Sequence, residues 1–364
     1  MNRTWLPLSI LLCSAGLGCS SDAPPPPPAP EWTAVGSPGF SAGAVSDLSF
    51  AADGATLYLA YVDGASSNRA TVMKSSGGAW ETVGAAGFSP GAVSSTSLCI
   101  HGGVPYVAFV DAASSSKATV MAYGGAGWTV VGAAGFSPNP VSHVAIASDG
   151  AALYVVLAGT SISGMTFAAG SWTALPGLGA GNIVTDMDLP LHASGGKLYF
   201  AWFDYFGGNT HTVVVAAYDV AQGTLSTLGQ LDVTQGVPPA IASDGGLVYW
   251  TWIYSSYISF QDARPQVYRL APGVAAQSIG SRLSDGDTGS VSVDAADGDV
   301  FLAYSDGSVS GKAVVKKYSN GAWALLGLKG FSADAANFVR VRVMGGTPYV
   351  AYQDLGNGGR ATVM

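Results

Sequence analysis

Charged residues are scarce in this chain: Asp, Glu, Lys and Arg together make up only 10% of its 364 residues. The formal net charge is −8, and Lys and Arg form no cluster in the sequence. Proteins that bind nucleic acid usually carry a basic run or a basic motif. The composition therefore predicts no nucleic-acid partner, and no contact of the folded part with an anionic membrane surface.

Cysteine is also nearly absent. Cys13 and Cys19 lie close to the N-terminus, and Cys99 stands alone in an apolar run. Because the first two fall in a predicted leader, the folded part has no intramolecular disulfide available, and its stability has to come from a hydrophobic core. We interpret Cys99 as a small buried hydrophobe.

Helical periodicity is missing after the leader, whereas Gly occurs 50 times. Short apolar runs such as 57–62 and 153–157 follow Asp-Gly or Gly-Gly pairs, among them Asp53-Gly54 and Gly102-Gly103. Such pairs accept positive φ and favour β-hairpins, and continuous apolar runs of this length are typical of strands buried on both faces. The pattern predicts an all-β fold.

A motif of the form Trp-x-x-Val-Gly recurs seven times at intervals of 44 to 53 residues. Each copy contains four strand-like runs, and a period in this range with four strands per copy is typical of a β-propeller. We predict a seven-bladed β-propeller of four-stranded antiparallel blades over residues 31–364. The first position of the motif is occupied by Trp32, Trp80, Trp128, Trp172, Leu225, Ala276 and Trp323.

The two ends of this region are complementary. Residues 32–35 read as a fourth strand without a first, second or third strand before it, and residues 361–364 read as a third strand without a fourth. Pairing these two segments would complete the seventh blade and leave no open sheet edge between the last blade and the first. We therefore expect the N-terminal strand to close the last blade.

The units Ala70-Thr71-Val72-Met73-Lys74 and Trp80-x-x-Val83-Gly84 also carry a family likeness. They resemble a bacterial exported β-propeller repeat family with units Ala-Thr-Val-Met-Lys…Trp-x-x-Val-Gly-x-x-Gly-Phe-Ser. The resemblance covers copies one, two and seven well and copies four to six loosely. It implies the same fold and says little about function.

Residues 1–18 have the pattern of a signal peptide: Arg3, an apolar run over 5–12, and small residues up to Cys19. This ending resembles a bacterial lipoprotein signal, which implies lipidation of Cys19; plain signal cleavage is the alternative. Residues 19–30 add a proline-rich tether that favours a stiff polyproline spacer. These features predict an exported protein, lipid-anchored to the bacterial outer membrane or cell surface, with a secreted or periplasmic protein as the alternative.

Two repeated patterns resemble functional motifs. Gly-x-Ser-x-Gly, at 39–43 and 87–91, is the nucleophile motif of some hydrolases, but here it lies between two strands and recurs, so we interpret it as a structural loop. An acidic residue after the second strand also faces a basic residue at the start of the third. We interpret these as ion pairs across a hairpin, with a ligand-binding ring as the alternative. The pairs are Asp63 with Arg69, Asp111 with Lys117, Asp306 with Lys312, Asp354 with Arg360 and, more weakly, Asp204 with His211.

The loops after the second strands of copies four and five depart from the repeat by adding aromatic residues. Flat aromatic faces edged by hydrogen-bonding groups suit a sugar ring or a protein partner. The candidate ligand-binding residues are Trp202, Tyr205, Phe206, Tyr254, Tyr257, Phe260, Asp262 and Arg264. The four histidines show no metal-binding spacing, so no metal and no other cofactor is predicted.

We predict a non-catalytic recognition module on the cell surface, which binds glycan or protein through loops of one propeller face and touches the membrane through its lipid only. One alternative is a propeller-type polysaccharide lyase or glycosidase acting at the central pore, where Asp47, His143 and Asp186 begin three first strands. A second alternative is a structural or assembly lipoprotein.

Overall fold

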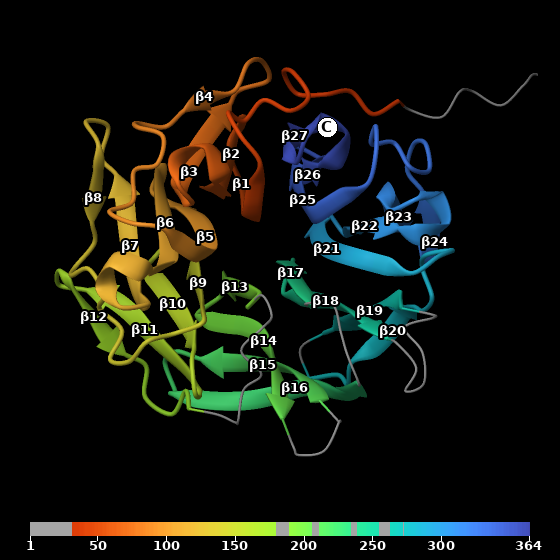
Figure 1. Cartoon of the computed structure of the whole chain (residues 1–364). Helices are drawn as coiled ribbons and strands as arrows, with labels where there is room; N and C mark the ends of the chain where they lie inside the picture. Colours follow the sequence, from red (N-terminus) through yellow and green to blue (C-terminus); the bar gives the residue numbers. More distant parts are fainter. Residues whose placement is uncertain (1–30, 180–188, 206–210, 234–238, 255–262, 272) are drawn as a thin grey trace, which may run out of the picture.

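The computed structural model describes residues 31–179, 189–205, 211–233, 239–254, 263–271 and 273–364. Seven antiparallel sheets are arranged in a ring, as predicted, and each follows the previous one along the chain (Figure 1). We call the sheets blades 1 to 7 and the strands of each blade a to d, from the ring axis outward. Within the described residues, no helix is long and apolar enough to cross a membrane.

Blades 1 to 3 have four strands each. Blade 1 consists of β1 (Val45–Asp53), β2 (Thr56–Asp63), β3 (Arg69–Ser75) and β4 (Glu81–Thr82). Blade 2 consists of β5 (Val93–His101), β6 (Val104–Asp111), β7 (Lys117–Tyr123) and β8 (Trp128–Val130). Blade 3 consists of β9 (His143–Ser148), β10 (Leu153–Ala158), β11 (Ile162–Ala168) and β12 (Ser171–Ala174).

Blades 4 to 7 complete the ring. Blade 4 consists of β13 (Leu191–Ser194), β14 (Lys197–Tyr205), β15 (His211–Asp219) and β16 (Thr224–Val233). Blade 5 consists of β17 (Ala240–Asp244), β18 (Leu247–Tyr254), β19 (Arg264–Leu270) and β20 (Gln277–Gly280). Blade 6 consists of β21 (Thr288–Ala296), β22 (Asp299–Asp306), β23 (Lys312–Ser319) and β24 (Ala322–Leu325). Blade 7 consists of β25 (Ala336–Met344), β26 (Thr347–Asp354) and β27 (Arg360–Val363).

The N-terminal segment closes blade 7, as predicted. The Val35 N–H donates to the Val363 carbonyl at 2.9 Å, and the Phe40 N–H donates to the Ala361 carbonyl at 3.0 Å. Residues 31–34 form no regular strand, however, so the fourth position of blade 7 is filled by an irregular segment beside β27. The chain turns away at Gly36, whose φ of 75° suits glycine, and this turn limits the length of the pairing.

The core consists of apolar layers between neighbouring blades. Ala60 and Val72 of blade 1, for example, pack with Val107 and Phe109 of blade 2. Cys99 is half-buried beside the layer between blades 2 and 3, and burial raises the pKa of its thiol to about 12. The thiol therefore stays protonated at neutral pH, in agreement with a packing role.

The repeated tryptophan joins each blade to the preceding one at the outer edge of the ring. Trp80 Nε1 donates to the Val35 carbonyl at 2.8 Å, and the indole stacks on Phe40 with ring centroids 4.4 Å apart. The same indole-to-carbonyl bond recurs at Trp32, Trp128, Trp172 and Trp323. Blades 4 and 5 have Leu225 and Ala276 in this position and therefore lack the indole donor.

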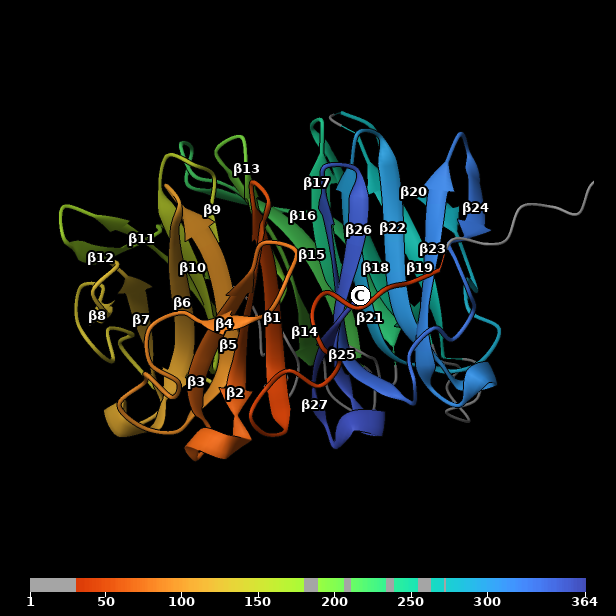
Figure 2. The same cartoon turned by 90° about the horizontal axis from the view of Figure 1, so that it is seen from above.

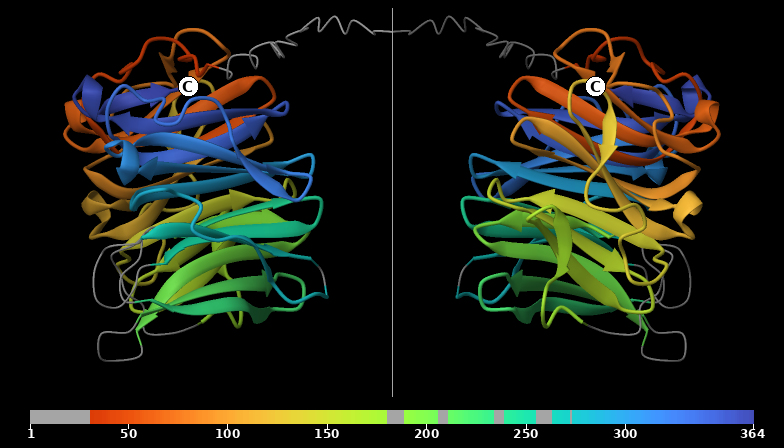
Figure 3. Two further views of the ribbon diagram at one scale, coloured as in Figure 1. Left: turned by 90° about the vertical axis from the view of Figure 1, so that its right-hand side faces the viewer. Right: turned by 90° about the vertical axis from the view of Figure 1, so that its left-hand side faces the viewer.

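The two faces of the ring differ in their connections. Strands b and c are joined on one face, which we call the b–c face, and the a–b and c–d hairpins lie on the other, the a–b face. Four short 3-10 turns appear as coils gathered on the b–c face (Figures 2 and 3). They are η1 (Gly64–Ser66), η2 (Ala112–Ser114), η3 (Gly307–Val309) and η4 (Leu355–Asn357).

Candidate functional site

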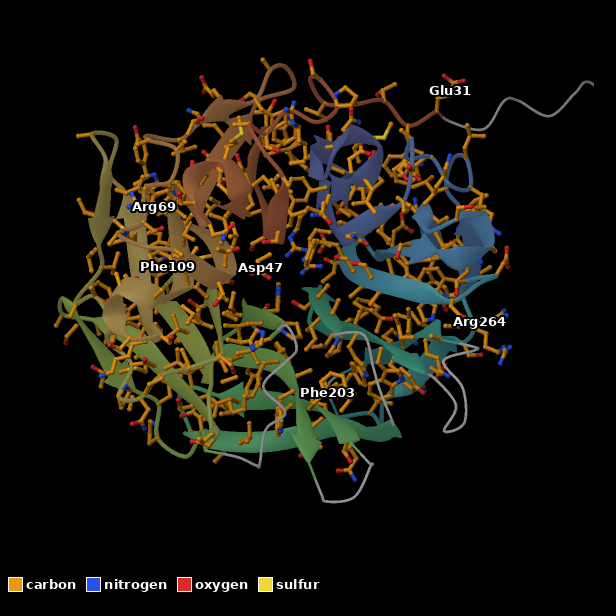
Figure 4. All side chains as sticks on the ribbon, viewed as in Figure 1. Glu31, Asp47, Arg69, Phe109, Phe203 and Arg264 are labelled. Carbon is orange, nitrogen blue, oxygen red and sulfur yellow. The ribbon has the colours of Figure 1, made fainter. Side chains whose placement is uncertain are left out.

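A cavity of about 510 Å³ occupies the ring axis and is lined by strands a. Its polar or aromatic lining includes Asp47, Ser95, Thr96, His143, Asn337, Phe338, Arg340 and Arg342. Asp47 lies beside the centre of the ring (Figure 4). The described lining contains two arginines, Arg340 and Arg342, and one aspartate, Asp47.

Strands a of blades 1, 2 and 7 share a bulge at their b–c end. The pairing of strand a with strand b shifts between Ser46 and Ser49 in blade 1, and blades 2 and 7 show the same shift. At each bulge a non-glycine residue has positive φ: 48° at Asp47, 52° at Ser95 and 50° at Phe338. This conformation is costly for side chains larger than glycine, and bulges commonly redirect a side chain beside a functional site.

Several polar groups of the lining have a structural role between blades. The Ser95 N–H donates to Asp47 Oδ2 at 3.2 Å, and the Leu98 N–H donates to Ser49 Oγ at 2.9 Å. The inner edge of strand a has no neighbouring strand, so these side chains satisfy backbone groups that would otherwise be unpaired. The same arrangement recurs from blade 2 to blade 3 and from blade 6 to blade 7, through Ser95, Ser97, Ser290, Ser292 and Asp294.

Three residues of blade 7 differ from this serine pattern at the b–c end of the cavity. Asn337 is exposed, and its Nδ2 donates to Gln353 Oε1 at 3.0 Å. Phe338 is half-buried; it belongs to the cavity lining and also packs against the hydrophobic layer between blades 7 and 1. Arg340 donates from Nη1 to the Val339 carbonyl at 3.1 Å, which holds its guanidinium along the wall. Together they offer an apolar ring surface between hydrogen-bonding groups.

A second group of titratable residues lies nearer the a–b face. Burial and then the charge of Arg342 lower the pKa of His192 to about 4, and its Nε2 lies 2.7 Å from Ser243 Oγ. Burial raises the pKa of Asp294, while the nearby Arg342 charge and the Val343 N–H oppose that shift. His192 is therefore neutral at pH 7 and bonds to its neighbour blade as an uncharged ring.

Two of the three predicted pore residues line the cavity. Asp47 and His143 belong to it, and Asp186 lies outside the described residues. Within the described part of the chain, no group of three metal-ligating side chains comes together.

The predicted aromatic patch of blades 4 and 5 requires one correction. Trp202 does not lie on a rim: it is only 6% exposed, within β14, and packs in the layer between blades 3 and 4 with Phe200. Trp202 lies inside strand b rather than in the loop after it, and its side chain belongs to the apolar layer between the blades. Tyr205 and Tyr254 end β14 and β18, and Phe206, Tyr257, Phe260, Asp262 and Cys19 lie outside the described residues.

Arg264 begins β19 at the outer part of blade 5 and is half-buried (Figure 4). Its Nη1 donates to the Ser284 carbonyl at 3.2 Å. This bond ties the guanidinium to the loop that leads into blade 6.

The acidic and basic residues predicted to pair do face each other across a hairpin, but the prediction that they form ion pairs is wrong. Asp63 is opposite Arg69 in the b–c register, yet its Oδ1 accepts the Ala65 N–H at 2.9 Å and its Oδ2 accepts the Ser66 and Thr71 hydroxyls at 3.0 and 2.8 Å. Asp111 makes the same bonds in blade 2, and Asp354 makes equivalent bonds in blade 7, where the Asn357 amide Nδ2 replaces the serine hydroxyl. Each carboxylate is buried and caps a 3-10 turn, while Arg69 and Arg360 are exposed and Lys117 is half-buried. Asp204 faces Thr212 rather than His211.

The Gly-x-Ser-x-Gly segments are structural, as predicted. Ser89 is 1% exposed; its Oγ accepts the Ala70 N–H at 3.0 Å and donates to the Gly91 carbonyl at 2.7 Å. Ser41, Ser137 and Ser332 make the same two bonds. These hydroxyls fasten the loop between blades to strand c and are not available as nucleophiles.

No protein-family model and no curated protein matches the chain. Solved structures do, and they are β-propellers. The fungal lectin of Aleuria aurantia, described as six-bladed with a fucose recognition mode, is 13% identical over 76% of this chain and 92% of its own, with a TM-score of 0.50. The SapL1 lectin, solved with alpha methyl fucoside, is 14% identical over 80% and 96%, with a TM-score of 0.51. A puromycin-hydrolyzing peptidase of Mycobacterium tuberculosis is 15% identical over 92% of this chain but 55% of its own, with a TM-score of 0.52.

The likeness to these structures establishes a shared fold, because at such low identity binding residues do not transfer. The chain is a seven-bladed β-propeller, and its structural neighbours include fucose-binding lectins as well as peptidases. The membership of a particular repeat family stays a prediction.

Proposed function

We propose that this protein is a non-catalytic glycan-recognition propeller that seats a saccharide at the b–c end of its central cavity. Phe338 carries the proposal. Its φ of 50° places a bulky residue in a strained conformation at the bulge where blades 1 and 2 have Asp47 and Ser95. Such strain concentrates at functional sites, and an aromatic ring beside a polar cavity provides a stacking surface for a sugar ring.

The polar groups around Phe338 complement a saccharide. Asn337 and Arg340 supply donors from the same strand, and Asp47 supplies a carboxylate from the next blade. The cavity volume of about 510 Å³ suits a small ligand or the end of a longer chain. The lectin neighbours support the proposal by example, because they carry sugar sites on a related ring of blades.

The predicted leader is the basis for proposing where in the cell the protein acts. A lipid on Cys19, followed by the proline-rich tether of residues 19–30, would hold the ring outside the cytoplasm, at the outer membrane or cell surface. Metabolic labelling with a palmitate analogue tests this: the label should enter the wild type and be lost in Cys19→Ala, and equal labelling of both would refute the anchor.

A glycan array probed with residues 31–364 tests the binding function. The wild type should bind a defined set of glycans, and Phe338→Ala should weaken that binding about tenfold, the loss of roughly 1.4 kcal/mol of stacking. Phe338→Tyr keeps the ring and should retain binding. Leu328→Ala, a change at a side chain that is 54% exposed, is the control for folding. No binding to any glycan, or equal binding by Phe338→Ala, would refute the proposal.

A catalytic function is the alternative, because Asp47 and His143 both line the cavity. A lyase or glycosidase of the propeller type would use them as base and acid. Release of unsaturated or reducing ends from polysaccharides, and its loss in His143→Ala, would favour this enzyme and contradict a purely binding role. A stable partner complex with no glycan binding would instead favour the assembly lipoprotein.

A further inference from the structure

Four consecutive blades present a basic residue at the same place on the b–c face, the start of strand c. We call this set the basic arc; its members are Lys312, Arg360, Arg69 and Lys117, in blades 6, 7, 1 and 2. In the amino-acid sequence these residues are far apart, and the ring brings them onto neighbouring blades (Figure 4 labels Arg69).

The acidic residues opposite the basic arc form no ion pair with it among the described residues. Asp63, Asp111, Asp306 and Asp354 are at most 1% exposed, and their oxygens accept bonds within their own turns. Among the described residues, the four basic side chains make neither a hydrogen bond nor an ion pair. Arg264, in the same position of blade 5, differs because it bonds to the Ser284 carbonyl.

On the a–b face, by contrast, three lysines form ion pairs. Lys74 pairs with Glu81 at 3.2 Å, Lys197 with Asp219 at 3.6 Å, and Lys317 with Asp299 at 2.6 Å, all at strand ends on the a–b face. These three lysines of the a–b face are thus paired, whereas the four members of the basic arc are not; Lys329, near the b–c end of blade 6, pairs with Asp285. An unpaired row of cations on an acidic protein raises the local concentration of anions at that face.

Three members of the basic arc start beside a glycine of the loop that enters the next blade. A Cβ at Gly87 would lie 3.4 Å from Arg69 Cβ, and one at Gly135 would lie 3.4 Å from Lys117 Cβ. A Cβ at Gly330 would lie 3.3 Å from Lys312 Cβ. A glycine of the loop entering the next blade therefore lies close to the Cβ of these three arc members; Arg69 and Arg360 are exposed, and Lys117 and Lys312 are half-buried. Asp334 is an exposed carboxylate on the same stretch, and its Oδ1 accepts the Ala335 N–H.

We propose that the basic arc selects an acidic polysaccharide, a chain that carries a carboxylate on successive sugars and crosses blades 6, 7, 1 and 2. This inference rests on the proposed glycan site, because blades 7 and 1 of the arc also supply Phe338 and Asp47 at the cavity. One sugar occupies the cavity end, and the carboxylates of the following sugars lie against the arc. Cations repeated on neighbouring blades complement a polymer that carries many carboxylates.

Binding of the purified protein to polygalacturonate, measured by calorimetry at low and at physiological salt, tests the inference. Fully methyl-esterified polygalacturonate is the neutral comparison. The arc variant Arg69→Gln/Lys117→Gln/Arg360→Gln should bind the acidic polymer about tenfold more weakly, as three exposed charge contacts of about 0.5 kcal/mol would give, and its salt dependence should flatten. The control Lys74→Gln/Lys197→Gln/Lys317→Gln removes the same charge from the a–b face and should bind within about twofold of wild type.

The outcomes separate the two proposals. If the arc variant binds polygalacturonate like the wild type while Phe338→Ala loses glycan binding, the basic arc has no such role and the cavity site stands. If wild type binds the esterified polymer as tightly as the acidic one, or the control loses as much as the arc variant, selection by the arc is refuted. Equal, arc-dependent binding of duplex DNA or of vesicles with anionic lipid would show general polyanion binding and overturn the choice of a saccharide.

Discussion

The Val35 N–H donates to the Val363 carbonyl across a separation of almost the whole chain, at 2.9 Å. This bond joins an irregular N-terminal segment to β27 and completes the seventh blade. The Phe40 N–H, which donates to the Ala361 carbonyl at 3.0 Å, adds a second backbone bond, so the closure relies on backbone groups.

Replacing Val35 by proline should therefore open the closure. Val35→Pro removes the N–H, whereas Val35→Ala keeps it and loses only methyl groups. We expect Val35→Pro to be less stable than Val35→Ala by about 1–3 kcal/mol in urea unfolding, the cost of a buried backbone group left without its partner. Equal stabilities would mean that the ring does not depend on this bond.

The Asp111 side chain should contribute far more to the stability of the fold than its basic neighbour Lys117. Asp111 is fully buried and accepts bonds from Ala113 N–H, Ser114 Oγ and Thr119 Oγ1. Asp111→Asn should cost about 2 kcal/mol, because hydrogen bonds to a charged acceptor weaken, and Lys117→Gln should change the unfolding free energy by less than about 0.5 kcal/mol. Similar losses in both variants would restore the ion-pair interpretation.

Blade 6 satisfies the same carboxylate in another way. Val309 and Val314 replace the side-chain donors found in blades 1, 2 and 7. Asp306 Oδ2 instead lies 3.7 Å from Lys329 Nζ, which also pairs with Asp285 at 2.5 Å. Lys329→Met should destabilise the protein by about 1–3 kcal/mol by leaving a buried oxygen uncompensated. Adding Val314→Thr should recover much of that loss, since Thr71 and Thr119 make this bond in blades 1 and 2. If Lys329→Met/Val314→Thr is no more stable than Lys329→Met, then Lys329 does not take the place of the threonine hydroxyl as the donor to Asp306.

Stability should fall in mild acid because of His192. Its pKa is lowered to about 4 in the folded protein, so between the ordinary histidine value of 6.5 and about 4 the unfolded chain binds more protons and folding weakens as pH falls. Asp294, with its raised pKa, acts in the opposite direction, so the readout is the difference between wild type and His192→Gln. As the pH falls across this window, that difference in unfolding free energy should shrink by up to about 1.4 kcal/mol per pH unit. A difference that does not change with pH would contradict a neutral buried His192.

The repeat allowed most of the fold to be predicted from sequence, because Trp-x-x-Val-Gly marks each outer strand and Asp-Gly or Gly-Gly pairs mark the hairpins. The prediction of ion pairs at Asp63 and Asp111 failed because opposite charges on facing residues say nothing of competing donors. The Ser66 and Thr71 hydroxyls and a turn N–H are closer to Asp63 than Arg69 is, and only coordinates reveal that.

Two errors concern the candidate site. Trp202 was placed in a loop because the repeat is loose in blade 4, whereas β14 extends through it and buries the indole. Phe338 was missed because a bulge with positive φ has no residue signature of its own. Aligning strands a would have offered one signal, since Phe338 stands where other blades have Asp47 and Ser95.

Hydrogen exchange with and without bound polygalacturonate tests the location of the site most directly. The account predicts slower exchange in peptides that cover the b–c ends of β25 and β1, around Phe338 and Asp47, and unchanged exchange in the hairpins of the a–b face. Slower exchange confined to the a–b face, or to blades 3 to 5, would contradict it.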